Sequence, residues 1–128
     1  AHRVKCLVDA GYFIHVKTST PLLTNVFESL FRDVTTLHKS QPVLPKSCVS
    51  RMIKPELCFF PENIQEFIKT PLFTLMSAFD SYQVNSILGS NTGEHIQARN
   101  STESQKNALR ELRSEFISAL PKPNDPKQ

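Results

Sequence analysis

The stretch TPLLTNVFESLFRDVTTLHK, residues 20–39, decides the fold that the sequence predicts. It begins with Thr20 and Pro21, residue types that favour the N-cap and the first position of a helix. The apolar residues behind them recur at the spacing of one helix face. They are Leu22, Leu23, Val26, Phe27, Leu30, Phe31, Val34 and Leu37. We therefore expect a helix over residues 21–38.

Three later segments also have helical spacing. Residues 60–69 have a proline at the first helical position, and residues 69–89 begin with a Thr-Pro pair and end on a glycine. Residues 102–120 begin with Thr102 and Gln105, the pattern of a capping box. The long apolar connection between the first helix and these segments contains three prolines, which exclude a continuous helix there.

The N-terminal residues 3–17 contain two short alternations of apolar residues. One involves residues 4–8 and the other residues 12–16. Between them stands Asp9-Ala10-Gly11, and Asp and Gly are residues that turns favour. A β-hairpin is the simplest interpretation, and a strand leading into a helical turn is the alternative.

Together these patterns predict a mainly α protein. We expect a small helical bundle of about four helices, with a short N-terminal β-hairpin, and an α+β fold is the alternative. Residues 1–120 would form a single helical domain, because the helices carry most of the apolar residues. Residues 121–128, which are rich in proline and lysine, would form an extended C-terminal tail.

The composition describes a globular chain with a weak positive charge. Of 128 residues 39% are hydrophobic, and 15 basic against 12 acidic residues give a formal net charge of +3. So small a positive excess permits nucleic-acid binding, but it is only weak evidence for such binding. No apolar run reaches the roughly 20 residues of a membrane span. The chain begins with Ala1, which indicates a processed protein or an excised fragment and leaves the compartment unknown.

The three cysteines are Cys6, Cys48 and Cys58. An odd number does not make a disulfide framework. The favoured interpretation is three buried thiols, since free cysteine packs as a small hydrophobic residue. The alternative is one bridge between Cys48 and Cys58, which would close a short loop across a proline-containing stretch.

The segment VDAGYF, residues 8–13, resembles the first strand of the NYN/PIN-like nucleases, where a hydrophobic strand ends in an aspartate followed by glycine. The resemblance implies that Asp9 would help to hold a divalent metal, which prefers oxygen ligands. Metal-dependent hydrolysis needs further carboxylates converging from other strand ends, and no second strand of that kind is visible. We therefore expect Asp9 to close a turn.

No catalytic or metal-binding motif appears elsewhere. The four histidines lack metal-ligand spacing, and the chain contains neither a Gly-x-Ser-x-Gly motif nor a phosphate-binding glycine loop. We expect no catalytic residue, no metal and no cofactor. Asn100 begins the tripeptide NST, a glycosylation acceptor, although the same residues also fit the start of a helix.

The absence of a convergent polar cluster favours a protein that acts by contact. We expect a non-enzymatic protein–protein interaction domain, as a subunit or excised domain of a larger assembly. The first helix is apolar at adjacent pairs of positions, more than one small bundle can bury. The expected partner surface comprises Leu23, Val26, Phe27, Leu30 and Phe31, with a polar rim of Lys106, Arg110 and Arg113. The alternatives are a secreted four-helix cytokine-like ligand and, less favoured, a metal-dependent nuclease-like fragment that uses Asp9.

Overall fold

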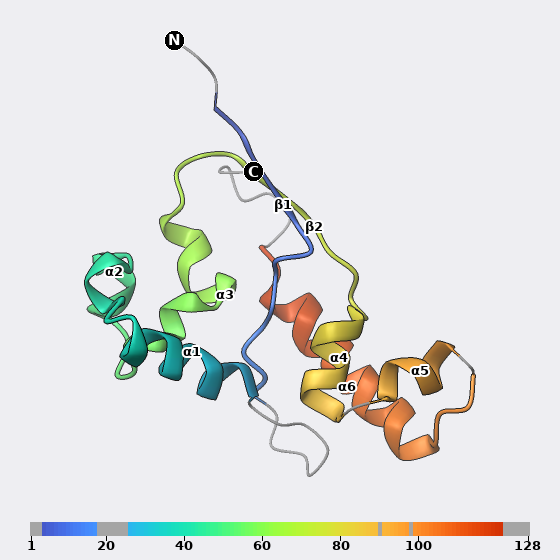
Figure 1. Cartoon of the computed structure of the whole chain (residues 1–128). Coiled ribbons are helices and arrows are strands. Elements are labelled where there is room, and N and C mark those ends of the chain that lie inside the picture. Colours follow the sequence, from blue (N-terminus) through green and yellow to red (C-terminus); the bar gives the residue numbers. More distant parts are fainter. Residues whose placement is uncertain (1–3, 18–25, 90, 98, 122–128) are drawn as a thin grey trace.

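The computed structural model describes residues 4–17, 26–89, 91–97 and 99–121, with the backbone alone at residues 95–97. Two short strands pair in parallel, β1 (Cys6–Asp9) and β2 (Leu72–Leu75). Cys6 lies opposite Leu72, and Asp9 lies opposite Leu75. Figure 1 shows the strand pair at one end of the molecule, with most of the helices gathered below it.

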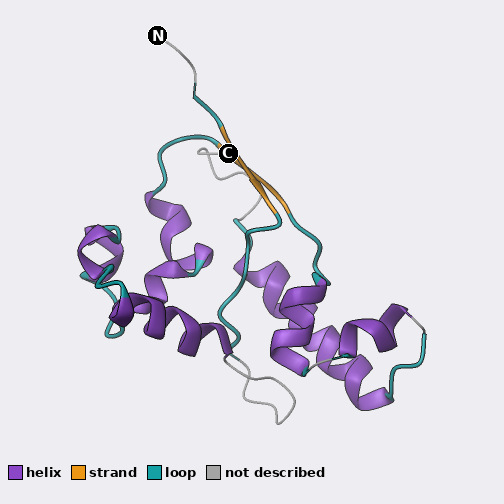
Figure 2. Ribbon diagram, viewed as in Figure 1, coloured by secondary structure: helices purple, strands orange, loops and turns teal. Residues whose placement is uncertain are grey.

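The chain between the two strands forms the crossover that a parallel pair requires. It contains α1, a long connection with short helical turns, and two short helices before β2. Their bounds are α1 Val26–Leu37, η1 Gln41–Val43, α2 Lys46–Val49, η2 Pro55–Phe59, α3 Pro61–Ile64 and η3 Gln65–Phe67. Three helices follow β2, namely α4 Ser81–Leu88, α5 Thr92–Gln97 and α6 Glu103–Ala119. Figure 2 shows how helices dominate the described chain.

The core is organised around the extended segment that leaves β1. Its alternate residues Tyr12, Ile14 and Val16 are all buried, although the segment is not part of the sheet. This segment runs between α1 on one side and α4 and α6 on the other (Figure 1). Their buried faces close on it with Phe27 from α1, Val84 and Ile87 from α4, and Ala108, Leu112 and Phe116 from α6. The helix α1, the extended segment, and the helices α4 and α6 therefore share one apolar core.

A run of phenylalanines joins α1 to η2 and to the extended segment, and we call Phe13, Phe27, Phe31, Phe59 and Phe60 the aromatic cluster. Phe13 stacks on Phe27 with ring centroids 5.2 Å apart, and Phe31 stacks on Phe59 at the same distance. Phe31 also meets Phe60 edge-on at 4.9 Å. Aromatic pairs in these geometries stabilise a core beyond the area they bury.

The prediction of a mainly α protein is confirmed, and the prediction of an N-terminal hairpin is wrong. Residues 6–9 do form a strand, but its partner is β2, more than sixty residues later in the chain. Residues 12–16 alternate because every second side chain enters the core from an extended segment. A period of two cannot distinguish these arrangements, because it reports extended backbone and not the pairing partner.

The single helix predicted over residues 69–89 is wrong in its first half. Leu72–Leu75 is a strand, and only Ser81–Leu88 is helical. The apolar residues of this stretch fit helical spacing by chance, while the hydrogen bonds from β1 hold residues 71–75 extended, beginning with Cys6 N–H to the Pro71 carbonyl at 2.9 Å. Tertiary pairing thus overrides the local pattern.

The other predicted helices are partly or fully present. Of the helix predicted over residues 21–38, the part from Val26 to Leu37 is present, and residues 21–25 lie outside the described residues. The last helix begins after Thr102, whose hydroxyl accepts from Gln105 N–H while the Gln105 side chain accepts from Thr102 N–H, which completes the predicted capping box. Residues 122–128 of the predicted tail lie outside the described residues. No helix in the described ranges is long and apolar enough to cross a membrane.

Candidate functional site

Two aspartates follow the carboxyl ends of the two parallel strands. Asp9 is the last residue of β1, and Asp80 stands five residues beyond the end of β2, directly before α4. Parallel strands have their carboxyl ends at one edge of a sheet, and functional groups in α/β proteins gather outside that edge. This carboxyl edge is therefore a candidate site.

The backbone around Asp80 holds its carboxylate in a defined position. Asp80 is the N-cap of α4, and its Oδ1 accepts a hydrogen bond from Gln83 N–H at 2.9 Å. Its own N–H donates to the Ser77 carbonyl at 3.3 Å, which folds the chain after β2 into a turn. No partner within the described residues is recorded for Oδ2, and the side chain is only half-buried. One oxygen is thus fixed by the helix, and the other can accept a further donor.

Gln83 connects this helix to the extended segment that follows β1, residues 10–17, which we call the core segment. Its side chain is fully buried, and Oε1 accepts from Ile14 N–H at 2.8 Å. That bond serves a donor in an extended segment that has no neighbouring strand to pair with. The Gln83 amide nitrogen finds no hydrogen-bond partner among the described residues. Gln83 therefore fixes the position of α4, and with it Asp80, relative to the segment that follows β1.

Asp9 is held less closely. The side chain is exposed, and the chain turns immediately after it, where Ala10 adopts a φ of 52° and donates to the Leu75 carbonyl at 2.9 Å. At Gly11 the neighbouring Val8 methyl would lie 3.2 Å from an added Cβ, so the turn leaves little room for a side chain. Asp9 thus ends a strand at a tight turn, and β1 leads from it into the core segment.

A polar groove of about 690 Å³ lies between the core segment, α3, η3 and the end of α6. Its walls include His15, Glu62, Gln65, Glu115 and Ser118. Glu62 Oε1 accepts from His15 N–H at 2.8 Å, whereas its buried Oε2 has no partner among the described residues. Burial raises the pKa of the Glu62 carboxyl above its ordinary value, because the charged form loses its hydration.

Two more titratable groups near this groove have displaced pKa values. Burial raises the pKa of the Tyr12 hydroxyl well above its ordinary value, and this hydroxyl donates to Gln65 Oε1 or the Ala119 carbonyl. The pKa of the Glu28 carboxyl is lowered, first by its hydrogen bond to Lys54 and then by that to His15. His15 Nε2 lies 2.8 Å from Glu28 Oε2, and both side chains are largely shielded from water.

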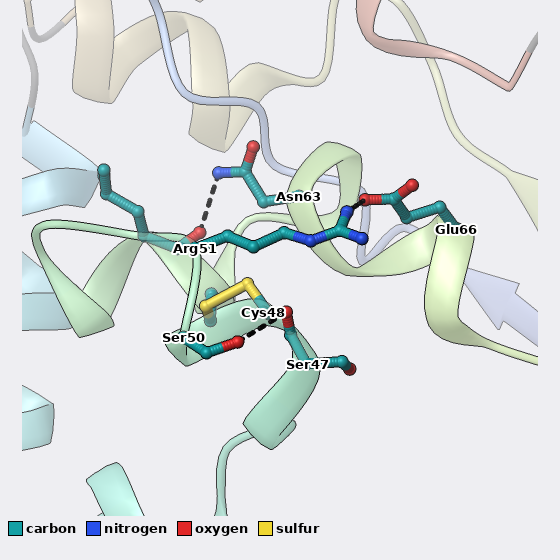
Figure 3. Close-up of a disulfide and its surroundings, with 8 residues drawn as sticks. Ser47, Cys48, Ser50, Arg51, Asn63 and Glu66 are labelled. Carbon is teal, nitrogen blue, oxygen red and sulfur yellow. Dashed lines mark hydrogen bonds and ion pairs between the residues drawn. A yellow bond between two sulfur atoms is a disulfide. The ribbon is translucent and has the colours of Figure 1, made fainter.

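Cys48 and Cys58 form a disulfide, with their Cα atoms 6.0 Å apart. The favoured interpretation of three buried thiols is therefore wrong, and Cys6, the free cysteine, is exposed. Figure 3 shows the bridge beside Arg51, which extends toward Glu66. Arg51 Nη1 lies 2.8 Å from Glu66 Oε1, and its guanidinium lies over the Phe67 ring at 4.9 Å. The disulfide thus joins α2 to η2, and the Arg51 contacts hold this part of the chain against η3.

The predicted partner surface is only partly exposed. Val26 and Leu30 are exposed, whereas Phe27 is buried and Phe31 is half-buried in the aromatic cluster. Leu23 lies outside the described residues. On the predicted polar rim, Lys106 pairs with Glu103 at 2.6 Å and Arg110 donates to Asn107, so two of its members serve their own helix. Arg113 is exposed on the same helix.

Three polar residues of this candidate site, Asp80, Gln83 and Glu62, were not among the site residues predicted from the sequence. Asp80 falls inside a stretch predicted to be helical, and its N-cap position directly before SYQV is the local pattern that could have marked it. Gln83 and Glu62 are polar residues that become buried only through tertiary packing, which no local pattern reports. In the described part of the chain, no group of three or more His, Cys, Asp or Glu side chains is placed to hold a metal ion.

Comparison with known proteins supplies the family. The model of the pectinacetylesterase (PAE) family matches residues 1–128. Pectin acetylesterase 7 of Arabidopsis thaliana is 48% identical over 85 residues, which cover 66% of this chain and 21% of that protein. Pectin acetylesterase 11 of the same plant is 36% identical over 126 residues, covering 92% of this chain and 32% of its own length. No solved structure matches.

These matches overturn the predicted function. The expectation of a non-enzymatic interaction domain is wrong, and so are its cytokine-like and nuclease-like alternatives. The chain spans less than a third of the length of these two relatives, so the absence of a convergent polar cluster from its 128 residues does not exclude an enzyme. The match of the family model to the full chain identifies this chain as a member of the pectinacetylesterase family.

Proposed function

We propose that this chain is part of an esterase that removes acetyl groups from pectin. The observation that carries the proposal is the match of the pectinacetylesterase model along all 128 residues. The relatives that support it are named pectin acetylesterases, and the chain spans 21 to 32% of the length of the two described above. The activity would belong to the complete enzyme, by which we mean the full-length polypeptide that contains this chain.

Asp80 is the residue through which this chain would take part in the reaction. Ester hydrolysis by an activated hydroxyl uses a histidine as general base, and a carboxylate orients that histidine and stabilises its charged form. Asp80 offers one oxygen fixed by Gln83 N–H and a second oxygen with no recorded partner in the described chain. The second oxygen could accept the N–H of a histidine. The nucleophile and the histidine would come from parts of the complete enzyme outside this chain.

Asp80 suits this role better than Asp9. Asp80 is half-buried and anchored to α4, which is fixed to the core through Gln83, whereas Asp9 is exposed at a turn. An orienting carboxylate must itself be held in place and partly shielded from water, because a mobile, hydrated group transmits little orientation. Asp9 would instead serve the turn that directs the core segment.

The test compares two substitutions in the complete enzyme. Asp80→Asn should lower kcat for acetate release from acetylated pectin by roughly 10³- to 10⁴-fold, the loss expected when the orienting carboxylate is removed. Asparagine is as good an N-cap as aspartate, so α4 should keep its stability. Asp9→Asn is the matched control and should keep most of the activity.

The outcomes separate the two parts of the proposal. If Asp80→Asn retains activity while the unaltered enzyme releases acetate, the role given to Asp80 is wrong. If the unaltered complete enzyme releases no acetate from pectin, the proposed function itself is wrong. Thermal unfolding of both variants shows whether a lost activity reflects a lost fold.

We also propose that residues 1–120 act as one structural unit, with α1, α4 and α6 as a small bundle around the core segment. Support comes from the contacts of α4 with both other helices and from the buried cluster that all of them share. A single unfolding transition, followed by far-UV circular dichroism and by hydrogen exchange in α1 and α6, would be the expected result. Separate transitions for the two helices would contradict it.

A further inference from the structure

The connection between α5 and α6 presents an asparagine to solvent. Asn100 follows Arg99, whose backbone φ of 55° marks a turn, and precedes the N-cap of α6. Asn100 is exposed, and its side chain has no hydrogen-bond partner among the described residues. Figure 1 shows this connection at the end of the molecule away from the two strands. The Asn100 amide is therefore accessible and lies outside the helices.

The residues that follow make this asparagine an acceptor for an N-linked glycan. Asn100, Ser101 and Thr102 form the tripeptide Asn-x-Ser/Thr, and no other asparagine of the 128-residue sequence begins such a tripeptide. A glycan is bulky and hydrated, so a folded protein can carry one only at the surface. The exposed position of Asn100 meets that condition. The sequence motif and the structure thus agree at this one position.

The disulfide supplies independent evidence on the compartment in which the chain folds. Disulfides form and persist in oxidising surroundings such as the secretory pathway, and they are rare in the cytosol. Cys48 and Cys58 are 0% and 1% exposed, so their bridge is enclosed by the fold. N-linked glycans are added to proteins that pass through the secretory pathway. The enclosed bridge and the exposed acceptor therefore indicate the same compartment.

We propose that Asn100 carries an N-linked glycan, which is added as the complete enzyme enters the secretory pathway. The donor is a lipid-linked oligosaccharide diphosphate. The bond between C1 of its first sugar and the diphosphate oxygen breaks, and C1 forms a bond to Nδ2 of Asn100. The amide loses one proton, and the lipid diphosphate is the leaving group. No oxidant or reductant takes part in this transfer.

Thr102 serves the acceptor before folding and the helix cap after it. In the folded chain its hydroxyl oxygen accepts from Gln105 N–H at 3.2 Å and lies 3.2 Å from Gln105 Oε1. The acceptor tripeptide requires a hydroxyl at its third residue, and this hydroxyl is engaged once α6 has formed. The glycan is therefore added before α6 folds. Asn100 itself takes no part in the capping box, so the finished protein accommodates both.

The first test maps the modification on the complete enzyme produced in a eukaryotic cell culture. Cleavage after lysine releases residues 70–106, in which Asn100 begins the only acceptor tripeptide. Removal of the glycan by a peptide N-glycosidase in heavy-oxygen water should convert Asn100 to labelled aspartate in most molecules. Recovery of this peptide with unlabelled Asn100 alone would overturn the inference. So would a complete enzyme that stays in the cytosol with Cys48 and Cys58 reduced.

The second test uses variants that separate the acceptor from the helix cap. Asn100→Gln and Thr102→Asp should each lower the mass of the complete enzyme by one glycan, and aspartate keeps a strong N-cap. The control Gln105→Ala disrupts the capping box but keeps the tripeptide, so its glycan should remain. An unchanged glycan mass in Asn100→Gln or Thr102→Asp would overturn the inference. None of these readouts requires acetate release, so the glycan and the proposed function can fail separately.

Discussion

The aromatic cluster consists of phenylalanines, and the sheet face formed by Leu7, Phe73 and Leu75 is also apolar, yet the two regions differ in their exposure to water. Phe60 in the cluster is fully buried and packs edge-on against Phe31, whereas Phe73 in the sheet is 65% exposed. Every partner of the cluster is present within this chain, including the disulfide connection beside it. Among the described residues, no helix buries the sheet face of Leu7, Phe73 and Leu75. One apolar region of the described chain is therefore buried, and the other is largely in water.

The largest expected effect compares the same substitution in the two regions. Phe60→Ala should destabilise this chain by roughly 3–5 kcal/mol, because it removes a fully buried ring and leaves a cavity. Phe73→Ala should cost less than about 1 kcal/mol, because most of that ring is already in water. Urea unfolding followed by circular dichroism measures both. Equal losses would break the contrast between a closed and an open region.

The disulfide should contribute the next largest effect. Cys48 and Cys58 are separated by 10 positions, and closing so short a loop contributes about 3 kcal/mol in the chain-entropy model. The double variant Cys48→Ala, Cys58→Ala should therefore unfold at lower urea concentration. Cys6→Ala, at the exposed cysteine on β1, should leave the midpoint unchanged. A larger loss from Cys6→Ala than from the bridge would show that the sheet, and not the connection, limits stability.

The smallest effect concerns Glu62 in the polar groove. Burial raises its pKa above the ordinary value of 4.5 in the folded chain, so the unfolded chain loses this proton first as the pH rises. The folded state binds more protons than the unfolded state between the two pKa values, and stability therefore falls as the pH rises through that window. Glu62→Gln should flatten this part of the profile of thermal midpoint against pH.

The control for that profile is Glu111→Gln, at an exposed position on α6, which should keep the slope of the unaltered chain. A profile of Glu62→Gln that matches the unaltered chain would mean that Glu62 is hydrated in solution. In that case the groove around Glu62 would be filled with water, and it would resemble the exposed sheet face more than the buried aromatic cluster.

Much of the helical structure could be predicted, because its signals are local. The capping box at Thr102 and the apolar stripe of residues 26–37 identify α6 and α1 from neighbouring residues alone. The strand at Leu72–Leu75 could not be predicted in the same way, because its hydrogen bonds come from a strand at the other end of the crossover. The candidate site could not be predicted for a related reason, since the position of Asp80 depends on the strand before it and on Gln83, which binds both Asp80 and the core segment.

The sequence by itself determined the mainly helical class and most of the described course of the first and last helices, because helix spacing and caps act over a few residues. Only the tertiary structure decided that β1 pairs in parallel with β2, that Cys48 meets Cys58, and that a buried Gln83 fixes the helix of Asp80. Each of these depends on contacts between residues far apart in the chain. Such contacts form only when burial of the whole core offsets the entropy lost in closing the long connections.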